Sequence, residues 1–501
     1  MAHVLIVGGG YVGLYTALRL QRRLRAELRR GDVSVTLVSP EPVMTYQPFL
    51  PEAAAGSIEP RHVVVPLRRV LRRVSVVTGT VSSVTHASRV ARVVPAGGEV
   101  YDLAYDVLVL APGSVARTLP IPGLAETAVG FKTVSEAIYL RNRVLECLDV
   151  AASTRDPAVR RRALTFVFVG AGYAGVEAFA ELEDMAREAV RRYYRELSWD
   201  ETRWVLVEAA PRILGEIGPG MAGYTLRRLR ARGMEVRLGT RLDSCVGGRV
   251  VLSDGETFEA DTVVWTAGVK PHPVVASTDL PLDERGRVVA AATLAVADGA
   301  WSAGDCAAVP DLTRPGEWCG PTAQHAVRQA RRLADNVVLS LRGRPPRPYR
   351  HRDAGSVASL GLHQGVAQVY GVRLRGWPAW FMHRTYHVSR VPTFNRKARV
   401  VADWTLALFF RRDIVSLGAL ARVPRLSTDV PARPSSTGSA PDDGRMDKVR
   451  DEAYWAELER RGREAYEEYV AEHGPIPQEY ADRVRQWVAE DAEAQRRRRG
   501  E

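Results

Sequence analysis

The spacing of apolar and polar residues at the start of the chain follows the order of a βαβ unit. Residues 3–8 form an apolar run that ends in glycines, residues 15–29 have helical spacing, and residues 33–38 form a second apolar run. Strand, glycine turn, helix and strand in this order predict two parallel strands joined by a helix. Because the same order recurs over residues 165–207, we expect two such units in one chain.

The segments around these units predict further strands. Residues 74–84 and 90–94 alternate like antiparallel strands, whereas residues 107–111 are apolar throughout. Residues 263–267 and 294–302 have the pattern of strands that return to the two sheets. The whole pattern predicts an α/β fold with two Rossmann-like dinucleotide-binding domains.

Residues 346–421 have a different pattern, in which aromatic residues and arginines interleave. The aromatic residues are Trp377, Trp380, Phe381, Trp404, Phe409 and Phe410, and the arginines are Arg373, Arg375, Arg384, Arg396, Arg411 and Arg412. Such a segment is typical of a membrane-surface element, with aromatics at headgroup depth and arginines on phosphates. A packed subdomain with a solvated basic face is the alternative. Residues 424–445, rich in Pro, Ser, Asp, Gly and Arg, predict a linker, and residues 446–496 have charged helical spacing.

Composition places the chain among ordinary globular proteins. Its 501 residues are 46% hydrophobic and 26% charged, which excludes a disordered or collagenous protein over most of the length. No run approaches about 18 apolar residues and no signal peptide precedes the first strand, so we expect no membrane-spanning helix. Four cysteines without a Cys-x-x-Cys pair argue against a disulfide framework and a zinc ribbon, and favour a reducing compartment.

The net charge of +12 comes from 70 Lys and Arg residues against 58 Asp and Glu residues. A cationic surface is attracted to anionic lipid or to nucleic acid, but no motif supports nucleic-acid binding. Lys132 is one of four lysines in an arginine-dominated chain. Either a compact ammonium is needed at that position or its placement is chance.

The first glycine turn, Gly8-Gly9-Gly10-Tyr11-Val12-Gly13, fits the pattern G-x-G-x-x-G. Gly8 allows the tight turn, Gly10 lets the backbone approach a pyrophosphate, and Gly13 lets the helix pack close to the strand. The phosphates then lie at a helix N-terminus, whose free N–H groups favour negative charge. The fingerprint expects an acidic ribose ligand after the next strand. Here Ser39 holds that position, and Glu41 follows two residues later.

The second turn has the same pattern, with glycines at Gly170, Gly172 and Gly175. Its next strand ends in Glu208, where the fingerprint expects an acidic residue. A carboxylate there accepts hydrogen bonds from both ribose hydroxyls and repels a 2′-phosphate, which predicts NADH rather than NADPH.

Several further strings share the pattern of one known family. They are Tyr46–Glu52 (YQPFLPE), Leu110–Ser114 (LAPGS), 169–177 (VGAGYAGVE), Trp265–Val269 (WTAGV), Ala303–Ala307 (AGDCA) and Pro321–Gln324 (PTAQ). With these strings the chain resembles the type II NADH dehydrogenases, the single-chain NADH:quinone oxidoreductases of the two-dinucleotide-binding flavoprotein superfamily. The resemblance covers residues 1–420. It implies FAD as the cofactor, NADH as the substrate and hydride transfer from NADH to FAD, with electrons passed to a membrane quinone without proton pumping.

The resemblance also assigns site residues beyond the two turns. It implies flavin contacts at Val81, Ala111, Gly113, Gly304, Asp305 and Ala323, an NADH contact at Gly268, and catalytic roles for Glu177 and Gln324. Arg328, whose guanidinium can donate hydrogen bonds to a quinone, is a further catalytic candidate. No metal is expected. Three alternatives stay open: Glu177 as a glutamate favoured by the helix dipole, Asp305 as a helix N-cap, and Gln324 as an ordinary helix residue. The histidines His325, His383 and His387 are expected to be surface or core residues.

The quinone motif departs from the family's Ala-Gln-x-Ala-x-Gln. Arg328 replaces the second glutamine, and Gln329 follows one position later, about 100° around the helix. This departure leaves an NADH-dependent reductase of a soluble or protein acceptor open. The 424–501 extension leaves a non-catalytic flavin-containing redox sensor or scaffold open. No cysteine precedes Cys147, which argues against a glutathione-reductase-type enzyme, and isolated thiols packed as small hydrophobes are expected.

These inferences predict six segments. They are an FAD-binding domain in two parts (1–118 and 281–345), an NADH-binding domain (119–280), a membrane-associating or interface domain (346–423), a linker (424–445) and a charged helical tail (446–501). The expected partners are NADH, a quinone and an anionic membrane surface on the cytoplasmic side of the cell membrane, where the protein is peripheral. A homodimer and a protein partner for the 424–501 tail are further expectations.

Overall fold

The computed structural model describes residues 1–351, 355–369, 371–410 and 412–416 of the chain. These residues belong to one compact unit, Met1–Val430. The predicted linker 424–445 and the predicted tail 446–501 lie outside the described residues, as does Arg411, and stay predictions.

A sheet forms around the first βαβ unit, as the apolar runs predict. β1 (Ala2–Val7) pairs in parallel with β2 (Val33–Ser39) on one side and with β8 (Val107–Leu110) on the other. β5 (Ser75–Thr85) extends the sheet and pairs antiparallel with β6 (Val90–Pro95). The order is β20-β21-β8-β1-β2-β5-β6-β7, with β7 at Tyr101–Ala104, β20 at Ala295–Ala297 and β21 at Ala300–Ser302. β8 is apolar and buried throughout, and residues 4–7 of β1 are as well, as expected for strands at the centre of a sheet.

The segment predicted as one returning strand, residues 294–302, is a hairpin instead. β20 and β21 pair antiparallel on either side of Gly299. Its φ of 72° is a backbone conformation that residues with a side chain rarely adopt, which suits glycine in a tight turn. β21 pairs in parallel with β8. Strands from residues 1–118 and from residues 281–345 therefore share one sheet.

The second βαβ unit builds a separate parallel sheet. β11 (Thr165–Val169) lies between β12 (Arg203–Glu208) and β17 (Thr262–Trp265). The order is β10-β17-β11-β12-β13, with β10 at Ala128–Val129 and β13 at Glu235–Leu238. α8 (Tyr173–Tyr193) follows β11, and Phe179 on this helix packs edge-on against Phe168 of β11. This sheet positions the second glycine turn.

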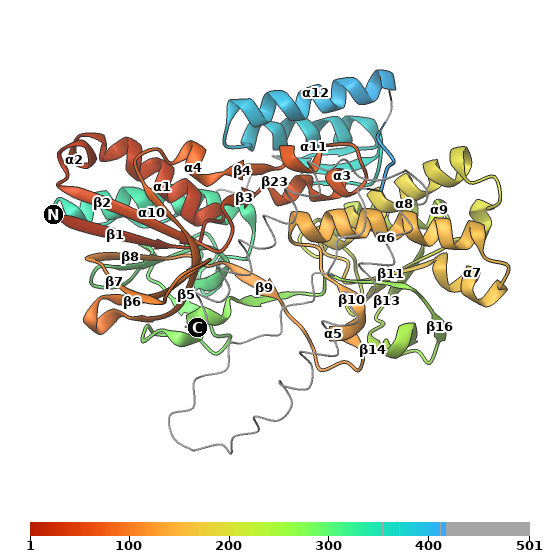
Figure 1. The fold of residues 1–501 in the computed structure, drawn as a ribbon, viewed down its shortest axis with the longest axis horizontal. Helices are drawn as coiled ribbons and strands as arrows, with labels where there is room; N and C mark the ends of the chain where they lie inside the picture. Colours follow the sequence, from red (N-terminus) through yellow and green to blue (C-terminus); the bar gives the residue numbers. More distant parts are fainter. Residues whose placement is uncertain (352–354, 370, 411, 417–501) are drawn as a thin grey trace, which may run out of the picture. The chain divides into compact units, whose positions relative to one another are not determined.

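Helices cover both sheets (Figure 1). α1 (Tyr11–Arg23) packs along α10 (Ala323–Leu341), although more than 300 residues separate their starts in the sequence. α6 (Val134–Ser153) begins at a capping box, in which Thr133 and Glu136 satisfy each other's backbone N–H groups. α10 begins after Thr322, whose side chain caps its first turn.

The last described segment forms a small three-stranded sheet and two helices. β23 (Gly355–Ser359), β24 (Gly365–Val369) and β25 (Val372–Arg375) are antiparallel. α11 (Trp377–Arg390) packs on β23 and β24, and α12 (Phe394–Phe410) lies beside α11 (Figure 1). β23 also contacts α8, so this segment is joined to the second βαβ unit.

Short elements complete the described fold. The helices are α2 (Arg25–Arg30), α3 (Leu50–Ala54), α4 (Leu67–Val70), α5 (Leu124–Thr127), α7 (Pro157–Ala163) and α9 (Pro219–Ala231). The strands are β3 (Val43–Thr45), β4 (Val64–Pro66), β9 (Ser114–Ala116), β14 (Leu242–Ser244), β15 (Arg249–Leu252), β16 (Thr257–Glu259), β18 (Val269–Pro271), β19 (Val288–Val289) and β22 (Ala307–Ala308). Within the described ranges, no helix is both long and apolar enough to cross a membrane.

Candidate active site

Of the three motif glycines in the first turn, Gly8 and Gly13 leave no room for a Cβ atom, whereas Gly10 has open space beside it. A Cβ on Gly13 would overlap the carbonyl oxygen of Gly8, and a Cβ on Gly8 would overlap the carbonyl oxygen of Ala111. Gly8 also has a φ of 102°. In contrast, a Cβ on Gly10 would meet no atom within 4 Å. The start of α1 is therefore pressed onto the end of β1, while the space next to Gly10 is free for a phosphate group.

The second glycine turn repeats this arrangement. A Cβ on Gly175 would overlap the carbonyl oxygen of Gly170, whose φ is 103°, whereas Gly172 has open space beside it. Gly268 also has open space and a φ of 87°. Thr266 Oγ1 donates to the Gly170 carbonyl oxygen at 2.8 Å and fixes the turn.

Glu208 lies at the end of β12, directly beside the second turn. Its Oε2 accepts from the Ala171 N–H at 2.6 Å and its Oε1 accepts from the Ala210 N–H at 2.8 Å. These two bonds hold the carboxylate in one orientation. Each oxygen keeps acceptor capacity for a ribose hydroxyl.

The loop that carries Gly304 and Asp305 packs against the start of α1. A Cβ on Gly304 would come within 2.7 Å of the Val12 side chain. The Gly304 N–H donates to Gln329 Oε1 at 2.8 Å. Gln329, on α10, thus holds the loop against the first turn, and Ala323 begins the same helix.

Asp305 belongs to a polar cluster and does not cap a helix. Its Oδ2 accepts from Ser114 Oγ at 2.7 Å, and Lys132 Nζ donates to Ser114 Oγ at 2.6 Å and to the Ser114 carbonyl oxygen. The N-cap of the short helix that contains Asp305 is Ala303, so the N-cap alternative was wrong. Burial lowers the pKa of Lys132 against the opposing charges of Asp305 and Glu136. These contacts favour a specific role for Lys132 over chance placement.

Four other predicted flavin contacts lie at different depths around the first sheet. Ser39 is buried at the end of β2, with its Oγ against Gly9, and Glu41 is exposed. Val81 is buried in β5. Gly113 follows β8 with a φ of 76° and open space beside it.

Glu177 lies in the second turn of α8 and is buried. Its Oε1 accepts from the Ser359 N–H of β23 at 2.8 Å and lies 3.1 Å from His383 Nε2 of α11. These contacts come from two other elements. A glutamate held only by the helix dipole would not need them, so they favour a functional position.

The described cysteines and histidines carry no metal site. All four cysteines are free and buried, and burial raises the pKa of the Cys306 thiol to about 11. A thiol with so high a pKa is a packed hydrophobic group rather than a nucleophile. Within the described part of the chain, no group of three His, Cys, Asp or Glu residues could hold a metal ion.

Comparisons with known proteins agree with this geometry. A family model described as pyridine nucleotide-disulphide oxidoreductase matches residues 2–330. A type II NADH:quinone oxidoreductase of Staphylococcus saprophyticus is 31% identical over 395 residues, which are 77% of this chain and 94% of that protein. The Ndh type II NADH:quinone oxidoreductase of Mycobacterium tuberculosis is 28% identical over 424 residues, which are 82% of this chain and 88% of the relative. The chain belongs to the type II NADH:quinone oxidoreductases.

A solved structure has the same fold. NDH2 from Plasmodium falciparum, in complex with NADH, matches with a TM-score of 0.76 at 16% identity. The match covers 83% of this chain and 99% of that chain. The predicted α/β fold with Rossmann-like domains is confirmed, and so is the resemblance to type II NADH dehydrogenases.

The side chains of the altered quinone motif contact different parts of the protein. Gln324 Nε2 donates to the Gly355 carbonyl oxygen at 2.7 Å, and its Oε1 is buried without a hydrogen-bond partner among the described residues. Arg328 Nη1 lies 3.3 Å from His351 Nδ1. Because Gln329 is rotated about 100° from Arg328, its amide faces the Gly304 loop instead of the Gln324 side of α10.

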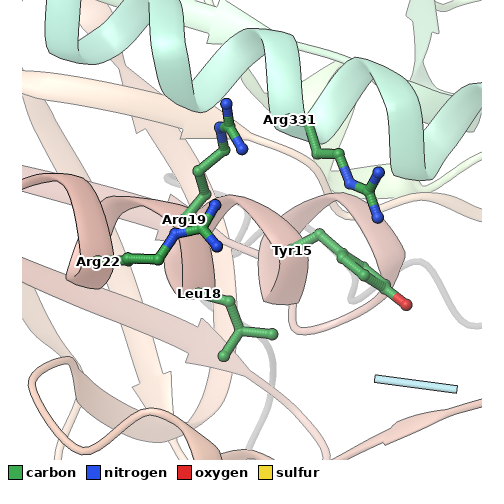
Figure 2. A pocket seen from close by; sticks show the side chains of 5 residues that line it. All are labelled: Tyr15, Leu18, Arg19, Arg22 and Arg331. Carbon is green, nitrogen blue, oxygen red and sulfur yellow. The ribbon is translucent and has the colours of Figure 1, made fainter. Parts of the chain in front are cut away.

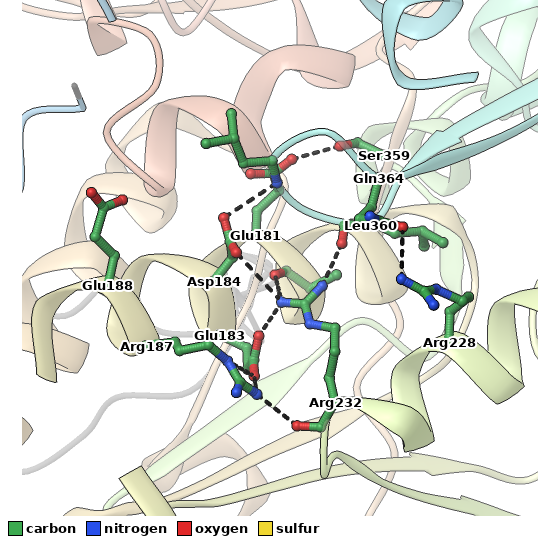
Figure 3. A network of polar contacts seen from close by, with 12 residues as sticks. Glu181, Glu183, Asp184, Arg187, Glu188, Arg228, Arg232, Ser359, Leu360 and Gln364 are labelled. Atoms are coloured by element: carbon green, nitrogen blue, oxygen red, sulfur yellow. Dashed lines mark hydrogen bonds and ion pairs between the residues drawn. The ribbon is translucent and has the colours of Figure 1, made fainter. Parts of the chain in front are cut away.

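A buried cluster of charges links α8 to the neighbouring elements (Figure 3). Glu183 is fully buried and pairs with Arg187 and Arg232. Arg412, whose side chain is 4% exposed, pairs with Asp184 and with Glu188. The fully buried Glu183 carboxylate thus has two guanidinium groups beside it, as burial of a charge requires.

Three residues of the aromatic and arginine segment differ from the membrane-surface interpretation. Arg384 is buried and its Nη2 lies 2.8 Å from Glu52 Oε2. Trp404 Nε1 donates to the same oxygen at 2.9 Å. Together with Arg412, these side chains face the protein body and cannot contact lipid phosphates, so the segment is partly a packed subdomain.

Sequence reasoning missed the functional positions of Glu52, His383, Ser114 and Gln329. Glu52 ended a string that carried the resemblance, and Ser114 ended another. A charged residue directly before an apolar run, residues 53–55, was the available signal for Glu52, because such a residue is buried only with a partner. His383 and Gln329 gave no comparable signal.

The two open glycines provide a matched pair of variants. Gly10 and Gly172 have extended backbones with negative φ, which alanine tolerates. We expect Gly10→Ala to weaken FAD retention by about tenfold and to leave NADH affinity unchanged, and Gly172→Ala to do the reverse, because each methyl fills one phosphate space. FAD per chain after gel filtration and an NADH titration measure the two effects. Equal loss of both nucleotides in either variant would contradict the assignment.

Glu181 predicts a pH-dependent stability. Burial, followed by the charge of Glu52, raises the pKa of Glu181 from 4.5 to about 7. The folded state therefore binds the proton more tightly than the unfolded chain, and stability falls as pH rises from about 4.5 to about 7. Glu181→Gln removes this loss.

We expect the melting temperature of Glu181→Gln to rise relative to the parent as pH increases from about 5 to about 8. Differential scanning calorimetry measures it, with Glu196→Gln on the surface as the control. Parallel curves for parent and Glu181→Gln would refute the raised pKa.

Proposed function

We propose that the chain is a peripheral flavoprotein that oxidises NADH through FAD and reduces a membrane quinone without pumping protons. FAD, when bound, accepts a hydride from NADH and passes two electrons to the acceptor. The observation that carries the proposal is the repeated geometry of the two turns, in which the first and last motif glycines leave no room for a Cβ atom and the middle one has open space beside it. Two phosphate spaces on two sheets suit one flavin and one nicotinamide nucleotide.

The first turn and the cluster around Asp305 would hold FAD. The N–H groups at the start of α1 favour the pyrophosphate, and the open side of Gly10 admits it. The Lys132–Ser114–Asp305 hydrogen bonds orient the Asp305 carboxylate, which suits a hydroxyl-bearing chain of the cofactor. Lys132 itself is fixed directly before the capping box of α6.

The second turn and Glu208 would hold NADH. The bonds from the Ala171 and Ala210 N–H groups fix the carboxylate beside the turn, where it receives the ribose hydroxyls. A 2′-phosphate would meet this negative charge, so NADPH is disfavoured. Glu177, two residues after the last glycine of this turn, would orient the nicotinamide.

Gln324 and Arg328 support two candidate acceptors. The buried Oε1 of Gln324 has no partner among the described residues and could accept a hydrogen bond from a quinol. A guanidinium at Arg328 can donate to a quinone carbonyl. It also adds a positive charge to the family's motif, and this observation supports an anionic soluble or protein acceptor as the second candidate.

The outer faces of α11 and α12 support peripheral contact with a membrane. Trp377 and Phe381 stack on each other on α11 and are about half exposed, and Phe409 and Phe410 are 77% and 78% exposed on α12. Exposed aromatics among basic residues suit the interface of an anionic bilayer. The cytoplasmic face of the cell membrane is the proposed location.

A basic groove between α1 and α10 supports the same proposal. It has a volume of about 490 Å³ and is lined by Tyr15, Leu18, Arg19, Arg22 and Arg331 (Figure 2). Arg19 pairs with Asp335, whereas Arg22 and Arg331 have no carboxylate partner among the described residues. Tyr15 donates to the carbonyl oxygen of Arg390, at the end of α11, so the groove borders the proposed lipid-facing surface and could take an anionic headgroup.

The half-reactions test the proposed function. We expect NADH to bleach the flavin within seconds in stopped-flow experiments, and a water-soluble quinone analogue to restore its colour at a catalytically sufficient rate. Ferricyanide serves as the control acceptor. Reduced flavin that reacts with ferricyanide and not with the quinone would favour the second candidate, and flavin that NADH does not bleach would favour the non-catalytic scaffold.

Vesicle binding tests the membrane contact. We expect Trp377→Ser combined with Phe381→Ser to lower binding to phosphatidylglycerol/phosphatidylcholine vesicles by about tenfold, because two interfacial aromatics are lost. The matched control is Tyr101→Ser combined with Tyr193→Ser, because both tyrosines are exposed outside α11 and α12. Co-sedimentation measures the bound fraction. Equal binding by both double variants would contradict this surface.

A further inference from the structure

His383 occupies a buried position between two carboxylates from different elements. Its side chain is 1% exposed. Nε2 lies 3.1 Å from Glu177 Oε1 of α8, and Nδ1 lies 3.9 Å from Glu52 Oε1 of α3. Both glutamates are buried as well. One imidazole thus faces a carboxylate oxygen with each of its ring nitrogens.

The two carboxylates are fixed by their other contacts. Glu52 Oε2 receives Arg384 and the Trp404 N–H, which leaves Oε1 without a hydrogen-bond partner among the described residues. The Ser359 N–H holds Glu177. Contacts at Oε2 therefore turn Oε1 of Glu52 toward the imidazole, and the Ser359 N–H fixes Oε1 of Glu177 beside it.

The charges around His383 favour a bound proton. Burial lowers the pKa of His383, but the hydrogen bond that its ring donates to Glu177 and the charges of Glu177, Glu52 and Glu181 outweigh it, so the net shift is upward. Arg384 is the opposing cation, paired with Glu52. His387 lies one helical turn away, with ring centres 4.5 Å apart, and its pKa is lowered by burial and by the charges of His383 and Arg390. The proton therefore resides on His383 rather than on His387.

The proposed reaction consumes one proton in each turnover, since NADH, H⁺ and quinone give NAD⁺ and quinol. We propose that His383 carries this proton and delivers it to Glu177. This inference rests on the proposed function. The N–H bond at Nε2 of the imidazolium breaks as an O–H bond forms at Glu177 Oε1, which leaves a neutral ring with its proton on Nδ1, and Nε2 takes up a proton from solvent before the next turnover.

The geometry suits this transfer on both sides of the ring. The 3.1 Å separation on the Glu177 side is within hydrogen-bond reach. On the other side, the Glu52 carboxylate lies 3.9 Å from Nδ1, where its negative charge stabilises the imidazolium. His383 acts through Glu177, so it is a positioning residue for the acceptor reaction and not for hydride transfer.

The test compares His383→Gln with His387→Gln in the FAD-loaded protein. We expect His383→Gln to lower kcat with a quinone analogue by about tenfold or more and to flatten its pH profile between about pH 6 and about pH 9. Flavin reduction by NADH and turnover with ferricyanide, which takes electrons without protons, stay within about twofold. His387→Gln keeps the parent's profile because it removes a neighbouring ring without a carboxylate contact.

A spectroscopic readout accompanies the kinetics. The oxidised FAD-loaded protein is labelled with [¹⁵N]histidine, and the NMR signal that disappears in His383→Gln is assigned to His383. We expect the chemical shift of this signal to show a protonated imidazole above about pH 6.5. Glu52→Gln, which keeps the imidazole, is the second variant if His383→Gln does not fold. Glu52→Gln should lower the pH at which the His383 signal titrates. It should also lower kcat with the quinone analogue and leave turnover with ferricyanide unchanged.

The outcomes separate the two proposals. A parent protein that does not reduce quinone overturns the proposed function, and this role of His383 with it. A parent that reduces quinone, together with a His383→Gln variant of unchanged rate and pH profile, overturns only the inference about His383. A His383 signal that is neutral at about pH 6.5 also overturns it.

Discussion

The close contact between a helix start and a strand end sets where each nucleotide can bind. Gly13 against the Gly8 carbonyl oxygen, and Gly175 against the Gly170 carbonyl oxygen, leave no room for a Cβ atom. Each contact brings the free N–H groups of a helix to the carboxyl end of a sheet, where a pyrophosphate neutralises their partial positive charge. The loops that follow β8 and β21 are positioned against the first of these contacts, and the loop after β17 against the second.

α8 links nucleotide binding to the C-terminal segment. It begins at the second turn and then buries Glu177, Glu181 and Glu183 along its length. Such charges destabilise a fold unless cations and hydrogen-bond donors face them. Arg232 pairs with Glu183, and Ser359 donates to Glu177 through its N–H and to Glu181 through its hydroxyl. Correct packing of residues 355–412 is therefore coupled to the orientation of the side chains that face the proposed nicotinamide site.

Sequence patterns predicted the local elements better than the partners of side chains. The two βαβ units and both turns follow from apolar runs and glycine spacing, which are local properties. The hairpin at Gly299 was missed although Asp298-Gly299, a pair typical of tight turns, lies between its two short strands. Arg384, Arg412 and Trp404 were placed on the membrane surface, yet each pairs with a carboxylate that is distant in sequence. The same limit applies to Gln329: its position about 100° around α10 from Arg328 follows from the sequence, but its bond to the Gly304 N–H does not.

The central claim is that two separate phosphate sites bring one flavin and one nicotinamide together in a single chain. A crystal structure of the purified chain with FAD and NADH tests it most directly. The account predicts density for the FAD pyrophosphate beside Gly10 and for the NADH pyrophosphate beside Gly172, with the two reactive rings in contact between them. Density for FAD beside Gly172, or for both nucleotides at one turn, would contradict it.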